Sequence, residues 1–580
     1  MDTSQSFWKN CGDSKIGPKS LYELQRRLLT HFILPCIPSG GSTIDLACSD
    51  GEFTSLLSII SSVTKGYDIS PKLVKKANES FGDSNITFEV SDLVNEELHG
   101  KYNTVSCMGL FTCITNNTHF KEIVEKIDRI SGESCYLILK DTLTEQDKSI
   151  HINNGNYEAI YRNEIDYIDT FKKYGFTITQ RHSLHKNEKI GIESVIFLLH
   201  RSKKTAVTDS TKKNIAIIHQ FNESWVNVDQ LYKELSNKEG VNCFAIITPF
   251  LHKNYEWSFF KSKEHLDSFG VKNFRWDQID LSKEYFDATV FLSPYEKTRP
   301  LDIATRKIKE ISKLTIYIPY GLECGGGEGN INLQYKQPSL EFIDVVYTRS
   351  ELAQQQFIKY CPYPAEVIPI GHPRLDYISS GLHTKTTHKK FTILWTPHFS
   401  FTSNKWSSFD IFFEFLVDLQ SNNRDLKIIF RPHPMFYKEL NQIGFDKEKT
   451  KNILSEMHDL GFMVDKMIDH RPSFMESDII LADPGSFLIE YLATGKPVVY
   501  LENPFGFGLN DEVKDLIDSF YVASSPIELS KIIFDLKDKN DTKFTKRQHA
   551  TNKTFKNIGT ASKMIADDII RRTFENRRYE

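Results

Sequence analysis

Arg431 and His433 are the residues whose types and spacing point most directly to chemistry, in the run Arg431-Pro-His-Pro434. The run ends an apolar segment typical of a buried strand, and its prolines restrict the backbone that carries the imidazole. A guanidinium and an imidazole at a strand end suit a diphosphate, because each charge-assisted hydrogen bond contributes about 1.5–3 kcal/mol. We expect both side chains to bind the phosphates of an activated donor, with His433 also serving catalysis.

A second phosphate-sized feature is the turn Asp483-Pro-Gly-Ser486, which lies between a strand pattern at 479–481 and a helix. The free amides at the start of such a helix favour an anion by about 0.3–1 kcal/mol, and Ser486 adds a hydroxyl. Glu490 follows one turn later on the same helix face. We expect Glu490 to hold a ribose or the transferred group.

The N-terminal third carries three acidic residues at the ends of successive predicted strands: Asp45, Asp68 and Asp92. After the first strand comes a turn of small residues, 47–51, which lets a ligand approach the backbone closely. A dinucleotide site would need three glycines there, and only Gly51 is present. The pattern instead predicts a ribose held by Asp68 and an adenine amino group held by Asp92.

This succession resembles the class I S-adenosylmethionine-dependent methyltransferases over residues 21–200. Asp45 and Gly51 match the first motif of the family, and Ala47 and Asp50 stand where glycines are usual. The resemblance implies S-adenosylmethionine as cofactor, with Asp50 able to face its ammonium group. The cofactor-binding residues that it implies are Asp45, Ala47, Ser49, Gly51, Asp68, Ile69, Asp92, Leu93 and Met108.

Methyl transfer to a hydroxyl requires a base within hydrogen-bond reach of the acceptor. Asp141, which follows the fifth predicted strand, is the residue that we expect to serve as this base. The other candidates for a base or for substrate contacts are Tyr161, Arg162, His119 and His182.

The remainder of the chain, 215–536, resembles the CDP-glycerol glycerophosphotransferase family, which has a GT-B architecture. Four segments carry the likeness: 370–376, 392–398, 431–434 and 477–486. The resemblance implies a cytidine-nucleotide-activated donor and a glycan or lipid-linked glycan acceptor. The donor-binding residues that it implies are His372, Arg374, His398, Arg431, His433, Asp483, Gly485, Ser486 and Glu490.

One departure concerns the base for the acceptor in this half. Tyr320 stands where that family has a histidine, and a tyrosine with a pKa of about 10 is a poor base at neutral pH. We place the role on Glu323, with His219 and Glu223 as alternatives. A carboxylate base makes transfer of a sugar at least as plausible as transfer of a polyol phosphate. The run 324–330 lacks the Lys-Ser/Thr of a P-loop, so we expect a loop over the acceptor side.

These sites need α/β domains to position them, and 580 residues exceed what one hydrophobic core supports. The fold class that we predict is a Rossmann-like methyltransferase domain followed by a two-lobed GT-B transferase. The expected division is 1–201 methyltransferase domain, 202–213 linker, 214–383 N-terminal acceptor lobe, 384–545 C-terminal donor lobe and 546–580 helical tail. Strand patterns support it at 42–46, 63–67, 86–90, 104–108, 135–140, 215–219, 245–248, 288–292, 315–318, 345–348, 392–395, 427–431, 479–481 and 497–500.

Composition excludes several classes of function. The net charge of −4 gives no field that would attract nucleic acid, and the nine cysteines have no zinc-like spacing, so we expect neither nucleic acid nor metal. No segment is apolar enough to span a bilayer, which predicts a cytoplasmic protein. The four arginines between 571 and 578 permit peripheral contact with the inner face of the membrane, although a helix that folds back on the body is the commoner fate of such a run. The sequence does not specify an oligomeric state.

Together these features predict a bifunctional enzyme of bacterial surface-polysaccharide biosynthesis, such as O-antigen, capsule or teichoic-acid-like polymers. It would combine S-adenosylmethionine-dependent O-methylation with transfer of a polyol phosphate or sugar. Because a methyl group on a terminal hydroxyl blocks elongation, the pairing suggests chain capping. The alternative is a GT-B glycosyltransferase with a CMP- or UDP-sugar donor, whose methyltransferase-like half is a non-catalytic glycan-binding module.

Overall fold

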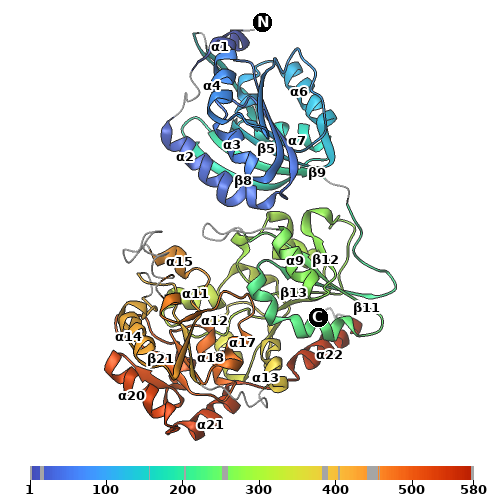
Figure 1. The fold of residues 1–580 in the computed structure, drawn as a ribbon. Helices are drawn as coiled ribbons and strands as arrows, with labels where there is room; N and C mark the ends of the chain where they lie inside the picture. Colours follow the sequence, from blue (N-terminus) through green and yellow to red (C-terminus); the bar gives the residue numbers. More distant parts are fainter. Residues whose placement is uncertain are drawn as a thin grey trace.

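The computed structural model describes residues 3–12, 18–155, 157–201, 204–250, 259–381, 390–402, 405–440, 455 and 457–575. Three sheets follow one another along this part of the chain, of nine, seven and six strands. The first forms the body that is blue to cyan in Figure 1, and the other two form the green-to-red body beneath it. The predicted fold class, three α/β units with the last two paired as lobes, is therefore confirmed.

The first sheet has the order β3-β2-β1-β4-β5, with parallel pairing throughout this run. This order is that of a doubly wound sheet, whose switch point lies between β1 and β4. The antiparallel strand β9 pairs with both β5 and β8 at the far edge, while a hairpin of β6 and β7 joins the end of β5. The strands are β1 Gly41–Leu46, β2 Ser61–Asp68, β3 Ile86–Val90, β4 Tyr102–Met108, β5 Ser131–Thr144, β6 Ile150–Asn154, β7 Tyr157–Asn163, β8 Thr177–Asn187 and β9 Ile192–Arg201.

The helices of this unit begin where local signals place them. Ser70 accepts a hydrogen bond from the Leu73 amide and precedes Pro71 at the start of α4, and Asn116 caps α6 in the same way. The helices are α1 Thr3–Asn10, α2 Lys19–Leu28, α3 Glu52–Leu57, α4 Pro71–Phe81, α5 Leu110–Cys113, α6 Asn117–Ile130 and α7 Glu164–Lys172.

The second sheet is parallel and has the order β12-β11-β10-β13-β14-β15-β16. Its central strands are buried on both faces, which explains their continuous apolar sequences. The strands are β10 Lys213–His219, β11 Val241–Ile247, β12 Asn273–Arg275, β13 Ala288–Phe291, β14 Thr315–Tyr317, β15 Val345–Tyr347 and β16 Glu366–Ile368. The helices are α8 Asp229–Ser236, α9 Phe259–Ser268, α10 Thr305–Glu310, α11 Glu328–Tyr335, α12 Glu351–Tyr360 and α13 Asp376–Gly381.

The third sheet is also parallel, in the order β19-β18-β17-β20-β21-β22, which is the 3-2-1-4-5-6 order of a Rossmann sheet. The predicted boundary between the two lobes, at 383–384, lies outside the described residues. The strands are β17 Phe391–Thr396, β18 Leu426–Phe430, β19 Met463–Val464, β20 Ile479–Ala482, β21 Val498–Leu501 and β22 Tyr521–Ala523. The helices are α14 Phe409–Asn422, α15 Phe436–Glu439, α17 Arg471–Glu476, α18 Ser486–Leu492, α19 Asp511–Lys514, α20 Pro526–Lys537 and α21 Phe544–Thr554.

The chain ends in α22 (Ala561–Phe574), which returns to the N-terminal lobe, as the red helix beside the green lobe in Figure 1 shows. Arg572 forms an ion pair with Glu366 of β16 at 2.7 Å, and Tyr347 of β15 donates a hydrogen bond to Asp568. Arg571 pairs with Asp568 at 2.5 Å. These two arginines thus form ion pairs within the protein, whereas Arg577 and Arg578 lie outside the described residues. Peripheral membrane contact through this tail stays a prediction.

The first unit and the N-terminal lobe share a buried seam. One apolar cluster contains Ile33 and Leu198 from the first unit together with Ile217 and Phe244 from the lobe. Within the seam Asp277 accepts a hydrogen bond from Tyr136 and lies 3.3 Å from His200 Nδ1. A buried polar group that is hydrogen-bonded in this way helps to fix the orientation of the first unit relative to the N-terminal lobe. Among the described residues, every helix is too short or too polar to cross a bilayer.

Candidate active sites

The turn between β1 and α3 holds three residues in the left-handed backbone region: Ala47 (φ 64°), Ser49 (φ 54°) and Gly51 (φ 81°). The conformation costs a non-glycine residue about 1–2 kcal/mol, so the turn stores strain at two positions. Besides Ala47, it is Ser49 and not Asp50 that takes a backbone conformation which favours glycine. Asp50 also forms an ion pair with Lys76 at 3.0 Å, which argues against its facing a cofactor ammonium.

Asp68, at the end of β2, holds this turn in place. Its Oδ2 accepts a hydrogen bond from the Ser49 amide and its Oδ1 one from the Ser70 amide, both at 2.9 Å. The carboxyl is buried, and burial raises its pKa above the ordinary value. Each oxygen keeps a second acceptor position, so Asp68 can support the turn and still accept ribose hydroxyls.

The carboxyl ends of β1 and β4 leave room for a ligand at the switch point. Gly109 follows Met108 with φ 97°, and a Cβ added there would meet no atom within 4 Å. Ile69, also on this edge, is half-buried. The strained turn, Asp68 and this open space fit the adenosyl cofactor that the sequence predicts.

Two predicted cofactor residues form hydrogen bonds within the local fold. Asp45 is buried and accepts a hydrogen bond from Thr54 of α3 at 2.6 Å, and burial raises its pKa to about 6. Asp92 closes a turn by accepting hydrogen bonds from the Val94 amide and from Asn95. The prediction that Asp45 contacts the cofactor is therefore not supported by its geometry, while Asp92 retains its place beyond β3.

Lys126 of α6, a residue that sequence reasoning missed, fixes the turn that carries Leu93. Its buried ammonium donates hydrogen bonds to the carbonyl oxygens of Leu93, Val94 and Glu96 at 3.1, 2.9 and 2.8 Å. The helix α1 was also missed. Ser4 donates a hydrogen bond to the Cys113 carbonyl, and Ser70 donates one to the Cys11 carbonyl, so α1 and its following turn lie along the carboxyl edge of the sheet.

Asp141 is not placed to act as a base. One oxygen accepts two hydrogen bonds from Thr112, and the other accepts one from Tyr167 at 2.7 Å. The carboxyl is 1% exposed and joins α5 and α7 to β5. Arg162 is likewise occupied, by the carbonyls of Phe111 and Ile114. The prediction for Asp141 as base is therefore corrected, since a proton acceptor needs an accessible oxygen.

In the transferase half, the structure brings His398 and His433 together. They follow β17 and β18, two adjacent parallel strands, and their ring centroids lie 5.4 Å apart. Phe399 packs against both rings at 4.4 Å. Gly485 lies beside them, since a Cβ added to it would be 3.9 Å from His398 Cδ2. Both rings are half-buried rather than enclosed.

The hydrogen bonds to these rings fix their tautomers. Nδ1 of His398 accepts the Ser400 amide and Nδ1 of His433 accepts the Met435 amide, each at 3.1 Å. The proton of each neutral ring therefore lies on Nε2. Burial lowers the pKa of His433 to about 4, and burial together with His433 lowers that of His398. At neutral pH the pair presents two uncharged N–H donors.

Arg431 and Asp483 support this pair instead of contacting a donor. Arg431 is bound by Asp465 at 2.5 Å and by the Met467 carbonyl at 2.7 Å. Asp483 accepts hydrogen bonds from the His398 amide, the Ser408 amide and the Ser408 hydroxyl. Both residues are at most 9% exposed. The predictions that Arg431 binds phosphates and that Asp483 binds the donor are corrected, and their role is to hold the loops around the histidines.

Replacing Asp483 with asparagine should remove a pH dependence of stability. Burial raises the pKa of Asp483 to about 7, so between pH 4 and 7 the folded state binds more protons than the unfolded state. Wild-type stability therefore falls as pH rises through this window, by about 3 kcal/mol between pH 5 and 8. Asparagine can keep all three hydrogen bonds. Urea unfolding of both proteins at both pH values should show that the stability difference between them changes by this amount, and an unchanged difference would contradict this assignment.

Glu490 lies at the centre of a buried network between the lobes. Its oxygens lie 2.5 Å from Arg374 Nε and 2.6 Å from His470 Nε2, and it is 0% exposed. Arg374 also donates a hydrogen bond to the Tyr320 carbonyl, and His372 Nε2 contacts the Pro319 carbonyl at 2.7 Å. These contacts replace the donor contacts predicted for Glu490, Arg374 and His372. Sequence reasoning missed His470 altogether.

Glu323 is similarly occupied. Its carboxylate lies 2.8 Å from Arg349, which also contacts Glu512 of α19 at 2.7 Å. Burial raises the pKa of Glu323 above its ordinary value, yet only 8% of the residue is exposed. Glu323 thus joins the lobes and is not free to act as the acceptor base.

The glycine-rich loop after β14 contacts the C-terminal lobe. Leu322 donates its amide to Ser486 Oγ at 3.0 Å, and the Gly326 amide donates to the Gly508 carbonyl at 2.9 Å. A Cβ at Gly325 would come within 2.6 Å of Trp406, which explains the need for glycine. The loop is therefore part of the interface between the lobes, and Ser486 bonds the opposite lobe.

No family model and no curated protein sequence matches the chain. Among solved structures, an S-adenosylmethionine-dependent methyltransferase from Methanosarcina mazei covers 29% of this chain and 96% of its own, at 13% identity and TM-score 0.26. The N-methyltransferase NodS from Bradyrhizobium japonicum, in complex with S-adenosyl-L-homocysteine, covers 34% of this chain and 99% of its own, at 11% identity and TM-score 0.27. A Listeria monocytogenes protein assigned as a UDP-N-acetylglucosamine 2-epimerase covers 64% of this chain and 98% of its own, at 15% identity and TM-score 0.47. At these values the likeness carries no functional argument.

In the described residues no cluster of three or more His, Cys, Asp or Glu side chains could hold a metal ion.

Proposed function

We propose that the chain is a bifunctional transferase of bacterial surface-polysaccharide assembly, joining an S-adenosylmethionine-dependent O-methyltransferase to a transferase that uses a nucleotide-activated donor. The strained turn at Ala47–Gly51, braced by Asp68 beside the open space at Gly109, supports the first half. S-adenosylmethionine, when bound, supplies an electrophilic methyl group. Asp68 would hold its ribose, and the Asp92–Leu93 turn, fixed by Lys126, would line the adenine.

The observation that supports the second half is the pair of N–H donors at His398 and His433 beside Gly485. Two donors at the ends of adjacent parallel strands suit the phosphate that departs when a cytidine-activated donor reacts. With Glu323 engaged by Arg349, the half-buried Glu223 after β10 is the carboxylate that we place as base for the acceptor hydroxyl. The acceptor is a glycan or lipid-linked glycan, and the transferred group a sugar or a polyol phosphate.

Replacing Asp68 with alanine is expected to weaken S-adenosylmethionine binding by about 100-fold, because the change removes both the ribose acceptor and the support of the Ser49 amide. Isothermal titration calorimetry measures the effect. Alanine at Glu79, an exposed residue of α4, is the matched control and should bind like wild type. If wild type itself does not bind, the first half is a non-catalytic module.

The donor is tested by hydrolysis without acceptor. CDP-glycerol, CDP-ribitol, a CMP-sugar and a UDP-sugar are compared at equal concentration, with release of the nucleotide as the readout. We expect a cytidine donor to be preferred. Preference for the UDP-sugar would refute the cytidine assignment, and absence of hydrolysis from every donor would refute the transferase.

A further inference from the structure

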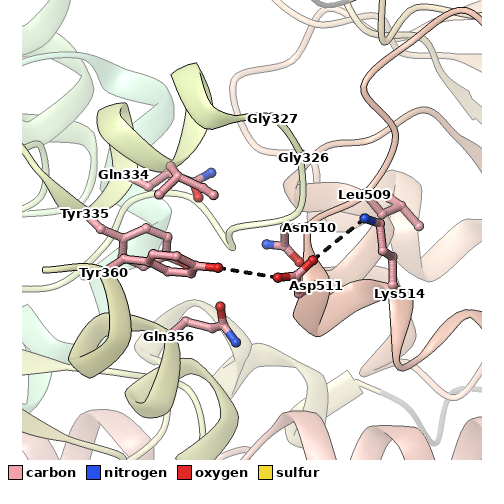
Figure 2. Close-up of a pocket in the computed structure, with 11 residues that line it drawn as sticks. Gly326, Gly327, Gln334, Tyr335, Gln356, Tyr360, Leu509, Asn510, Asp511 and Lys514 are labelled. Atoms are coloured by element: carbon pink, nitrogen blue, oxygen red, sulfur yellow. Dashed lines mark hydrogen bonds and ion pairs between the residues drawn. The ribbon is translucent and has the colours of Figure 1, made fainter.

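A shallow pocket lies at the interface of the two lobes (Figure 2), and neither His398 nor His433 lines it. Helices α11 and α12 form one side, and the residues around α19 form the other. Tyr360 reaches across from one side to Asp511 on the other, with 3.4 Å between Oη and Oδ2.

The lining is rich in groups that pair with hydroxyls. Gln334 and Gln356 supply side-chain amides with both donors and an acceptor. Asn510 supplies amide donors, since its oxygen accepts the Val513 amide, and Asp511 supplies a carboxylate. The rings of Tyr335 and Tyr360 lie 5.7 Å apart with 33° between their planes, and they form an aromatic wall. Amides and a carboxylate bind neighbouring hydroxyls, while an aromatic face covers C–H groups. This combination fits an uncharged sugar ring.

Asp511 lies between two lysines at the edge of the pocket. Lys514 of the lining and Lys359 of α12 each lie 3.7 Å from its carboxylate. The test therefore includes inorganic phosphate as a competing ligand. The phosphate-binding histidines of the donor site are separate from these residues.

The glycine-rich residues 325–327 lie between this pocket and the donor site. Gly326 and Gly327 line the pocket, whereas the neighbouring Gly325 packs against Trp406 on the other side. The ring of Trp406 lies 5.3 Å from that of His398. A ligand in the pocket would thus be next to the donor site without overlapping it.

We propose that this pocket is an acceptor subsite that binds one uncharged glycosyl unit. The assignment rests on the proposed transferase function. It implies that the growing glycan enters along the interface of the lobes between α12 and α19, with a neighbouring sugar presented to the donor site.

The test is binding of simple glycosides to the full-length protein, without donor. The probes are the methyl glycosides of glucose, galactose and mannose, together with N-acetylglucosamine, and saturation-transfer NMR is the measurement. At least one probe should bind, and Gln356→Ala should weaken its binding about tenfold. Gln355→Ala is the matched control, because Gln355 is the preceding residue of α12 and is exposed outside the pocket.

Three outcomes would overturn the proposal: no probe binds, binding is equal in Gln356→Ala and wild type, or inorganic phosphate displaces the glycoside. The last would identify an anion site. Circular dichroism of both variants establishes that they are folded. Because no donor is present, failure here is distinguishable from failure of the transferase, which is shown by donor hydrolysis in wild type.

Discussion

Replacing Glu490 with alanine should lower the free energy of unfolding of the transferase lobes by about 3–5 kcal/mol. The carboxylate is the shared partner of Arg374 and His470, and all three side chains are buried. Burial alone would raise its pKa, but Arg374 and His470 hold the pKa of Glu490 below its ordinary value. Its removal leaves the Arg374 guanidinium in the interior with its charge uncompensated.

The measurement is urea unfolding followed by tryptophan fluorescence. Glu476→Ala is a suitable control, because Glu476 pairs with Lys427 at the surface, where such a pair contributes about 0–1 kcal/mol. Glu490→Gln keeps the volume and should lose less stability than the alanine variant. If Glu490 instead held the donor ribose, Glu490→Gln would raise the donor KM and leave the unfolding free energy unchanged.

The elements of the fold were predictable because their signals are local. Strands such as β10 and β20 are buried on both faces of a parallel sheet, so they are continuous apolar runs that any window of the sequence contains. The fourteen predicted strands therefore agree with observed strands within a few residues. The strands that were not predicted are β6, β7, β8, β9, β12, β16, β19 and β22. The order of the strands needed the additional rule that doubly wound sheets reverse at a switch point.

The partners of buried charges were not predictable. Glu490 lies on a helix and Arg431 follows a strand end, and both positions suit a donor site. Arg374 nevertheless neutralises Glu490, and Asp465 neutralises Arg431, although each partner is distant in the sequence. Nothing in the sequence marks these pairs, because ion pairing depends on tertiary placement. The orientation of the His398 and His433 rings depends instead on a local contact, because each ring accepts the amide two residues further along the chain.

The backbone of the turn at 47–51 was predictable only in part. A tight turn after β1 was expected, but which residues take left-handed conformations was not. Ser49, with φ 54°, carries the strain that a glycine would avoid. Asp68 offsets this cost by accepting the Ser49 amide, a contact between residues that are distant in sequence but adjacent at the ends of paired strands.

Replacing His433 with alanine should lower donor hydrolysis by about 10- to 100-fold, which corresponds to the loss of one charge-assisted hydrogen bond to phosphate. His398→Ala should have a similar effect. The double variant should lose less than the product of the two, because both rings face the same ligand. His458→Ala, at an exposed histidine of the same lobe, is the control. Hydrolysis by His433→Ala at the wild-type rate would remove the basis for the donor site.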